Sequence, residues 1–251
     1  MKKFRSMIFT AIAAAVMLSA GTFAQESAET RAGEAYRNGN FEEAVSLYRE
    51  LARQAPHNPY YYYNLANSYY KTNKPGRAVA NYYKAFSLLP RDSDIRHNLA
   101  FAMNQAGTRL VPEGIPETLF NLFSYFSRTE LKGLTLLSLW AFIFLLMFYS
   151  FWKNARPHLM RALVFAAFVT IVCGGWYLAQ VETSPRNPAV VVDGIGELRT
   201  GPGDNFGAAA TVPEGHVVDI ISANGEWYEI GLPKEGLKGW INKKFIEPAG
   251  I

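Results

Sequence analysis

The sequence predicts a multidomain chain with three unlike parts: an all-α stack of helical repeats, a two-helix transmembrane hairpin and a small all-β barrel. Three observations predict this fold class. Residues 25–109 are self-similar at a spacing of 34 residues, uncharged apolar runs of 20 residues follow at 133–152 and 162–181, and short β-favouring runs occupy residues 189–251. A helix of 20 residues rises about 30 Å, the apolar thickness of a bilayer.

Residues 1–24 have the pattern of an export signal. Lys2, Lys3 and Arg5 supply a positive start, an apolar stretch follows, and small residues precede Gln25, where we expect cleavage. An uncleaved amphipathic anchor is the alternative. In both cases the segment that follows is expected outside the cytoplasm.

The repeat places the same residue types at equivalent positions of successive units. Alanine at a helix crossing lets two helices approach closely, and proline cannot extend the helix that precedes it. The matched sets are Ala44/Ala78, Tyr48/Tyr82, Tyr36/Tyr70, Pro56/Pro90 and Ala32/Ala66/Ala100. This pattern resembles the tetratricopeptide repeat, which implies helix pairs over 25–58 and 59–92 and a capping helix over 93–107.

Two full repeats bury too little surface to be stable alone, because such units stabilise by stacking. We therefore expect the module to be stabilised by packing against a partner, against a second copy or against the hairpin. The concave side of a repeat stack is lined by the first helix of each pair, and the register places Tyr63, Asn67, Tyr70 and Lys71 there. These four residues are the predicted protein-binding site; packing between the repeats is the alternative for the tyrosines.

Residues 110–132 form an interfacial linker in this interpretation. After the helix-breaking stretch at 111–116, leucines, phenylalanines and a tyrosine crowd a segment too short to span a bilayer and too apolar for a free linker. A helix on the outer membrane surface is expected there. A strand or loop buried against the repeats is the alternative.

The loop at 153–161 sets the orientation of the hairpin. It carries Lys153, Arg156 and Arg161 and no acidic residue. Positive loops stay in the cytoplasm, so the repeats and the barrel are both expected on the outer side of the inner membrane. The small residues Ala162, Ala166, Thr170 and Gly174 line one face of the second span, for packing against the first span or against a partner's helix.

After a proline-containing linker at 182–188, residues 189–251 resemble the bacterial SH3 (SH3b) domain. The pieces that carry the resemblance are Leu198–Gly203, Pro213–Ile221, Glu226–Ile230 and Gly236–Asn242. The resemblance implies binding of wall peptides or proteins, with Trp227, Tyr228 and Trp240 as a possible ligand groove. A core role for the two tryptophans is the alternative.

Several function classes are excluded or disfavoured. A formal net charge of +4, partly within the export signal, leaves no basic excess for nucleic acid. The single cysteine, Cys173, excludes a disulfide framework and a cysteine-based zinc site. His57, His97, His158 and His216 fall in separate segments and have no metal-ligand spacing. No catalytic motif occurs, so we expect no enzyme, no cofactor and no metal.

The order of parts resembles the repeat-containing proteins of the bacterial aerotolerance (Bat) operon, the BatE type. That resemblance implies an inner-membrane adaptor in envelope stress, acting with von Willebrand A-domain membrane proteins and a MoxR-type ATPase. The alternative is a peptidoglycan-binding protein in which the SH3b domain carries the function.

Overall fold

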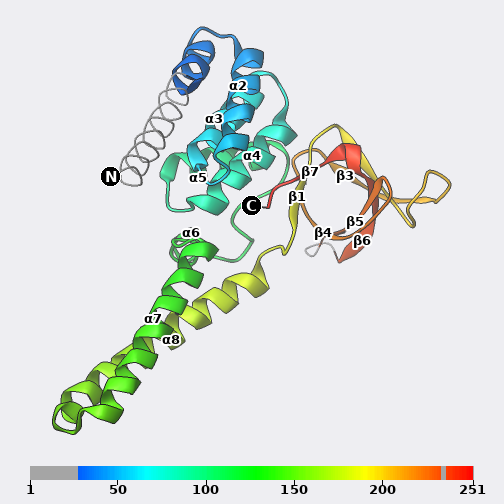
Figure 1. Cartoon of the computed structure of the whole chain (residues 1–251). Coiled ribbons are helices and arrows are strands. Elements are labelled where there is room, and N and C mark those ends of the chain that lie inside the picture. Colours follow the sequence, from blue (N-terminus) through cyan, green and yellow to red (C-terminus); the bar gives the residue numbers. More distant parts are fainter. Residues whose placement is uncertain (1–27, 233–235, 251) are drawn as a thin grey trace, which may run out of the picture.

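The computed structural model describes residues 28–232 and 236–250, and it confirms the predicted fold class. Helical repeats and a β-barrel lie next to each other, and two long helices extend away from both as a hairpin (Figure 1). The expected export signal at 1–24 lies outside the described residues.

The repeat region consists of successive antiparallel helices. Residues 28–37 are helical, and the next four helices are α2 (Phe41–Gln54), α3 (Pro59–Lys71), α4 (Pro75–Leu88) and α5 (Ser93–Gln105). Gly39 takes a φ of 82° in the turn before α2, and Asn73 takes a φ of 56° in the turn between α3 and α4. Glycine and asparagine tolerate this left-handed conformation best. Proline stands at the first position of α3 and of α4. The backbone nitrogen at this position has no partner within the helix, so the missing N–H of proline costs no helical hydrogen bond.

The alanines of the 34-residue register form the centre of this region. Ala32, Ala66 and Ala78 are fully buried, and Tyr48 and Tyr82 are almost so. The helices therefore meet at small side chains, with aromatic rings filling the space between the helices.

The hairpin is longer than the two uncharged runs. Helix α7 spans Arg128–Phe151, a short 3₁₀ turn covers Lys153–Ala155, and α8 spans Arg156–Thr183. A capping box between Ser127 and Glu130 starts α7 ahead of the apolar run at 133–152. Both helices are long and apolar enough to cross a membrane.

Most large apolar side chains of the hairpin point away from protein: Leu137 is 69% exposed, Phe165 68% and Ile171 73%. The small-residue face of α8 does the opposite. Ala166 is buried, and a Cβ at Gly174 would lie 3.5 Å from the Thr135 side chain of α7. The face therefore serves close packing of α8 on α7.

The barrel is one antiparallel sheet in the order β3-β2-β6-β5-β4-β1-β7. Its strands are β1 (Pro188–Val191), β2 (Ile195–Arg199), β3 (Ala208–Pro213), β4 (Val217–Asn224), β5 (Trp227–Leu232), β6 (Leu237–Asn242) and β7 (Ile246–Pro248). Sequence reasoning missed β3 and β7. Strand β3 is largely exposed and begins with three alanines, and β7 has three residues, so neither carries a periodic signal.

The barrel packs on the repeats through β1 and β7, which contact α4. Val190, Val192 and Ala249 are buried in the same cluster as Val79, Tyr82 and the other core residues of the repeats. We expected the short repeat stack to lean on a partner, a second copy or the hairpin. The barrel fills this role within the chain, a support that local sequence patterns do not reveal.

Candidate functional site

The first-helix surface of the repeats is the face formed by residues 28–37, α3 and α5. Positions 34 residues apart occupy equivalent places on these helices. The predicted Tyr63, Asn67, Tyr70 and Lys71 are the α3 members of this set.

Three of the predicted residues join neighbouring helices through their polar groups. Asn98 of α5 donates a 2.9 Å hydrogen bond to the Tyr63 hydroxyl. The Tyr70 hydroxyl donates 3.1 Å to the side-chain oxygen of Gln105. Asn67 accepts a hydrogen bond from Tyr82 of α4.

These three side chains are half-buried and Lys71 is exposed. The tyrosines and Asn67 thus bridge helices while keeping part of their surface accessible, so the packing and binding interpretations both find support in the geometry. An approaching chain would meet rings, hydroxyls and amides that are already held in place.

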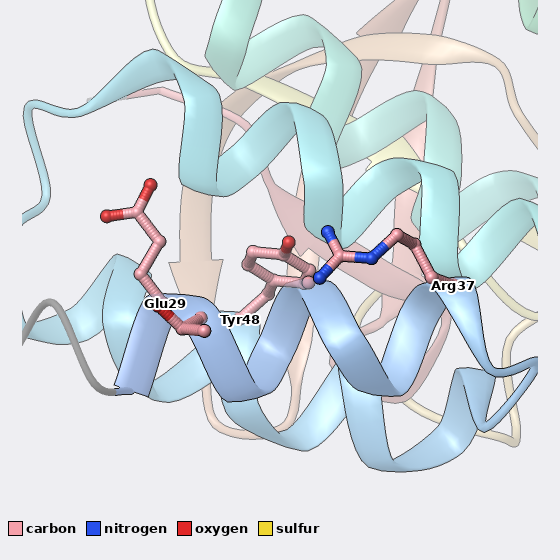
Figure 2. A pocket seen from close by; sticks show the side chains of 5 residues that line it. Glu29, Arg37 and Tyr48 are labelled. Atoms are coloured by element: carbon pink, nitrogen blue, oxygen red, sulfur yellow. The ribbon is translucent and has the colours of Figure 1, made fainter.

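A hollow of about 470 Å³ continues this surface onto the first repeat (Figure 2). Glu29, Gly33 and Arg37 line it and lie 34 residues before Tyr63, Asn67 and Lys71. Figure 2 shows the Arg37 side chain reaching toward the Tyr48 ring, with Glu29 farther along the same helix. Gly33 has no side chain. The hollow therefore opens at the position that is equivalent to the Asn67 side chain in the next repeat.

Sequence reasoning missed Phe101 of α5. Its side chain is 48% exposed, and its ring lies edge-on to Tyr70 at 6.1 Å between centroids. The 34-residue spacing could have identified it, since Phe101 is one repeat after the predicted Asn67. Phe101 adds the largest accessible apolar side chain on this part of α5.

The tyrosine hydroxyls beneath this surface stay protonated at neutral pH. Burial, and then the neighbouring Tyr63, raise the pKa of Tyr36 above its ordinary value of 10.0. Burial also raises the pKa of Tyr82, with smaller contributions from Tyr63, Tyr36 and Tyr70. The centre of the surface therefore offers neutral hydrogen-bonding groups, and its charged groups are Glu29, Arg37 and Lys71.

Strand alternation separates the three residues of the predicted SH3b groove. In the β5–β6 register Trp240 lies opposite Glu229, and Tyr228 lies opposite the buried Ile241. Trp227 and Trp240 therefore share the outer face of the sheet, whereas Tyr228 points to the core face. Neither tryptophan belongs to the buried core of the barrel.

Arg199 completes the outer face of the barrel. It pairs with Trp240 across β2 and β6, and its guanidinium carbon lies 6.0 Å from the centre of the Trp227 ring. Glu197 holds the guanidinium at 2.7 Å. Sequence reasoning missed Arg199, because the pairing of β2 with β6 is a long-range contact.

The contact between repeats and barrel fixes how these two surfaces are presented. Glu214 accepts a 2.7 Å hydrogen bond from the backbone N–H of Gly76, in the first turn of α4. Two ion pairs flank it, Arg77–Asp193 and Lys84–Glu247, both at 2.9 Å. We name Glu214, Asp193 and Glu247 the acidic clamp; it ties the barrel to one side of α4.

Within residues 28–232 and 236–250, no group of three or more His, Cys, Asp or Glu side chains is arranged to hold a metal ion. His57, His97, His158 and His216 lie in separate elements or loops. Cys173 lies within α8 as a free thiol.

Comparison with known families agrees with the two modules. Residues 35–80 match the tetratricopeptide repeat, and residues 194–247 match the bacterial SH3 domain. No curated protein matches the chain. Both matched types are non-catalytic binding modules, which suggests a protein-binding or peptidoglycan-binding role. The chain joins a tetratricopeptide segment to a bacterial SH3 domain through two long apolar helices.

Proposed function

We propose that this protein is a non-enzymatic adaptor, anchored in the inner membrane of a bacterium, that captures a partner protein on the first-helix surface of its repeats. The observation that carries the proposal is that the first helices of the repeats present accessible groups on one surface: Arg37, Tyr63, Asn67, Tyr70 and Phe101. Rigid aromatic side chains with polar ends bind proteins at low entropic cost.

The arrangement of the parts supports an anchored adaptor. Both folded domains lie at the end of the hairpin opposite the positive residues at 153–161 (Figure 1). We expected a loop there, but only 153–155 form a turn, and 156–161 are the first residues of α8. A cytoplasmic position of this end would put the repeats and the barrel on the periplasmic side. The exposed apolar surface of the hairpin needs a lipid environment.

The partner class follows from the order of the parts. Because this order resembles that of the BatE-type proteins, we propose von Willebrand A-domain membrane proteins of the aerotolerance system as the partners. The role in envelope stress rests on the same resemblance.

Capture from mild detergent tests the proposal. Tagged full-length protein at native expression level should retain von Willebrand A-domain proteins, identified by mass spectrometry. Tyr63→Phe/Tyr70→Phe removes only the hydroxyls and should weaken retention; Tyr63→Ala/Tyr70→Ala should abolish it. Tyr60→Ala is the matched control, since Tyr60 is an exposed tyrosine of the same helix outside the predicted set. Undiminished capture by a folded Tyr63→Ala/Tyr70→Ala protein would refute the site.

A peptidoglycan-binding role is the second candidate, favoured by the Trp227, Trp240 and Arg199 face of the barrel. Full-length protein in detergent should then sediment with purified wall material, and Trp240→Ala should reduce the bound fraction. Sedimentation unaffected by Trp240→Ala and Trp227→Ala would exclude this face as the wall-binding site. The full chain is the correct sample because β1 and β7 pack on α4.

A further inference from the structure

The segment at 115–126, which includes helix α6 (Glu117–Phe123), presents an apolar face that no part of the described chain covers. Ile115 is 46% exposed, Leu119 57%, Leu122 62% and Tyr125 48%. Leu119 and Leu122 lie about one turn apart within α6, and Ile115 and Tyr125 flank the helix. No charged residue occurs from Thr118 to Ser127. We name residues 115–126 the anchor segment.

The anchor segment is bound to the outer end of α8. The Phe123 carbonyl accepts hydrogen bonds from the Trp176 indole at 2.9 Å and the Gln180 amide at 2.7 Å. Gln180 also donates to the Phe126 carbonyl at 3.2 Å, and the Phe126 ring meets Trp176 edge-on. These bonds satisfy the carbonyl of Phe123, the last residue of α6, and that of Phe126 in the turn before α7.

The same contacts set the height of the anchor segment relative to the hairpin. Gln180 lies two residues before Glu182, the first charge after the uncharged run at 162–181. A segment held at Trp176 and Gln180 therefore lies where the apolar surface of α8 ends. In a membrane that level is the boundary between acyl chains and headgroups, where tryptophan and tyrosine are favoured.

The polar side of the junction faces the repeats. Arg91, which follows α4, forms a 2.8 Å ion pair with Glu130 in the first turn of α7. Arg128 donates to the Pro185 carbonyl at 3.2 Å, in the linker to the barrel. The junction thus joins an exposed apolar segment, held against the hairpin, to polar links that run from the first turn of α7 to the repeats and to the linker before the barrel.

We propose that the anchor segment lies in the outer leaflet of the membrane, with Ile115, Leu119, Leu122 and Tyr125 inserted at the headgroup–acyl boundary. This proposal rests on the membrane-spanning hairpin of the proposed function. The occupant of the face is a lipid surface, because Trp176 and Gln180 hold the segment against the hairpin, whose large apolar side chains are exposed, at the level where the uncharged run of α8 ends. The anchor segment holds the repeats and the barrel at a fixed height above the bilayer.

Spin-label accessibility in vesicles of bacterial phospholipids tests the proposal on the full chain. Cys173→Ser provides the background, and single labels are placed by Leu119→Cys and Leu122→Cys. Oxygen concentrates among acyl chains and a nickel chelate stays in water, so both labels should collide more with oxygen than with the chelate. Glu113→Cys, before the anchor segment, should show the reverse, and Ile143→Cys, within α7, should report the deepest position.

The controls separate failure of this proposal from failure of the hairpin. If Ile143→Cys is deep while both anchor labels are open to the chelate, the anchor segment is in water and the proposal is wrong. If both anchor labels are shielded from oxygen and chelate alike, a protein covers the face, which also refutes it. If Ile143→Cys is itself open to the chelate, the membrane-spanning hairpin of the proposed function fails.

Discussion

At the scale of single residues, one glycine and one glutamate meet closely at the contact between repeats and barrel. The amides at the start of a helix have no partner within it and carry a partial positive charge. Lys74, before α4, provides no side-chain cap. Glu214, from the loop before β4, accepts from the Gly76 amide instead, across 138 residues of sequence. A carboxylate at this position satisfies a donor and complements the helix dipole.

Gly76→Ala should destabilise the protein even though alanine is the better helix former. A Cβ at position 76 would lie 2.5 Å from Glu214 Cγ and 2.6 Å from the Val191 carbonyl oxygen. Overpacking of this kind costs about 1–3 kcal/mol. Thermal unfolding of the full chain in detergent should show a lower midpoint for this variant.

Gly207→Ala is the matched control, because nothing lies within 4 Å of its Cβ position. Its midpoint should remain close to that of the unmodified protein. Equal midpoints for the two variants would contradict the close fit of Glu214 and Val191 around Gly76.

At the scale of elements, aromatic side chains connect the two helices of the second pair, α3 and α4. Tyr82 of α4 donates to Asn67 of α3, and its ring lies 5.9 Å from that of Tyr63. Burial raises the pKa of Tyr82 above its ordinary value of 10.0. The native state therefore holds the phenolic proton more tightly than the unfolded chain does.

The pH dependence follows from the sign of this shift. A raised native pKa contributes stability that is fully present below the unfolded pKa of about 10 and is lost as the pH rises toward the native pKa. Unfolding midpoints of the full chain should fall steeply above about pH 10. Tyr82→Phe should lower the midpoint at neutral pH by loss of the hydrogen bond and make the alkaline decline shallower. Tyr60→Phe, an exposed site, is the control, and an unchanged slope in Tyr82→Phe would contradict the assignment.

At the scale of the whole molecule, the repeats and the barrel form one unit above the hairpin. Val190, Val192 and Ala249 complete the core of the repeats, and the acidic clamp adds polar contacts on α4. The Lys84–Glu247 pair is the least exposed of these, with 15% and 24% of the side chains accessible. We therefore expect the two proposed binding surfaces to keep a constant separation and orientation.

Distance measurement between spin labels checks this rigidity. Labels at Arg53→Cys on α2 and Ala223→Cys on β4, both exposed positions, should give a single narrow distance distribution in the Cys173→Ser background. Glu214→Arg/Glu247→Arg places positive charge against the N-terminus of α4 and against Lys84, and should broaden the distribution. A broad distribution in the unmodified clamp would show that the barrel moves independently.

Sequence periodicity was sufficient to predict positions within the repeats and the faces of single strands. The 34-residue register identified the first-helix positions, and one more step of it leads to Phe101. Strand alternation would also have separated Trp227 from Tyr228, because neighbouring residues of a strand point to opposite faces. Strands β3 and β7 could not be predicted in this way, since their pairing with β2 and β1 defines them.

The sequence by itself determined the three kinds of fold, the apolar hairpin and the register of the repeats, because each depends on residues close together in the chain. Only the tertiary structure decided that the barrel supports the repeats, that Glu214 caps α4 and that Trp176 and Gln180 hold the anchor segment. Those contacts join residues 53 to 138 positions apart. Such residues come together only when the chain folds, so a pattern among neighbouring residues cannot predict their contacts.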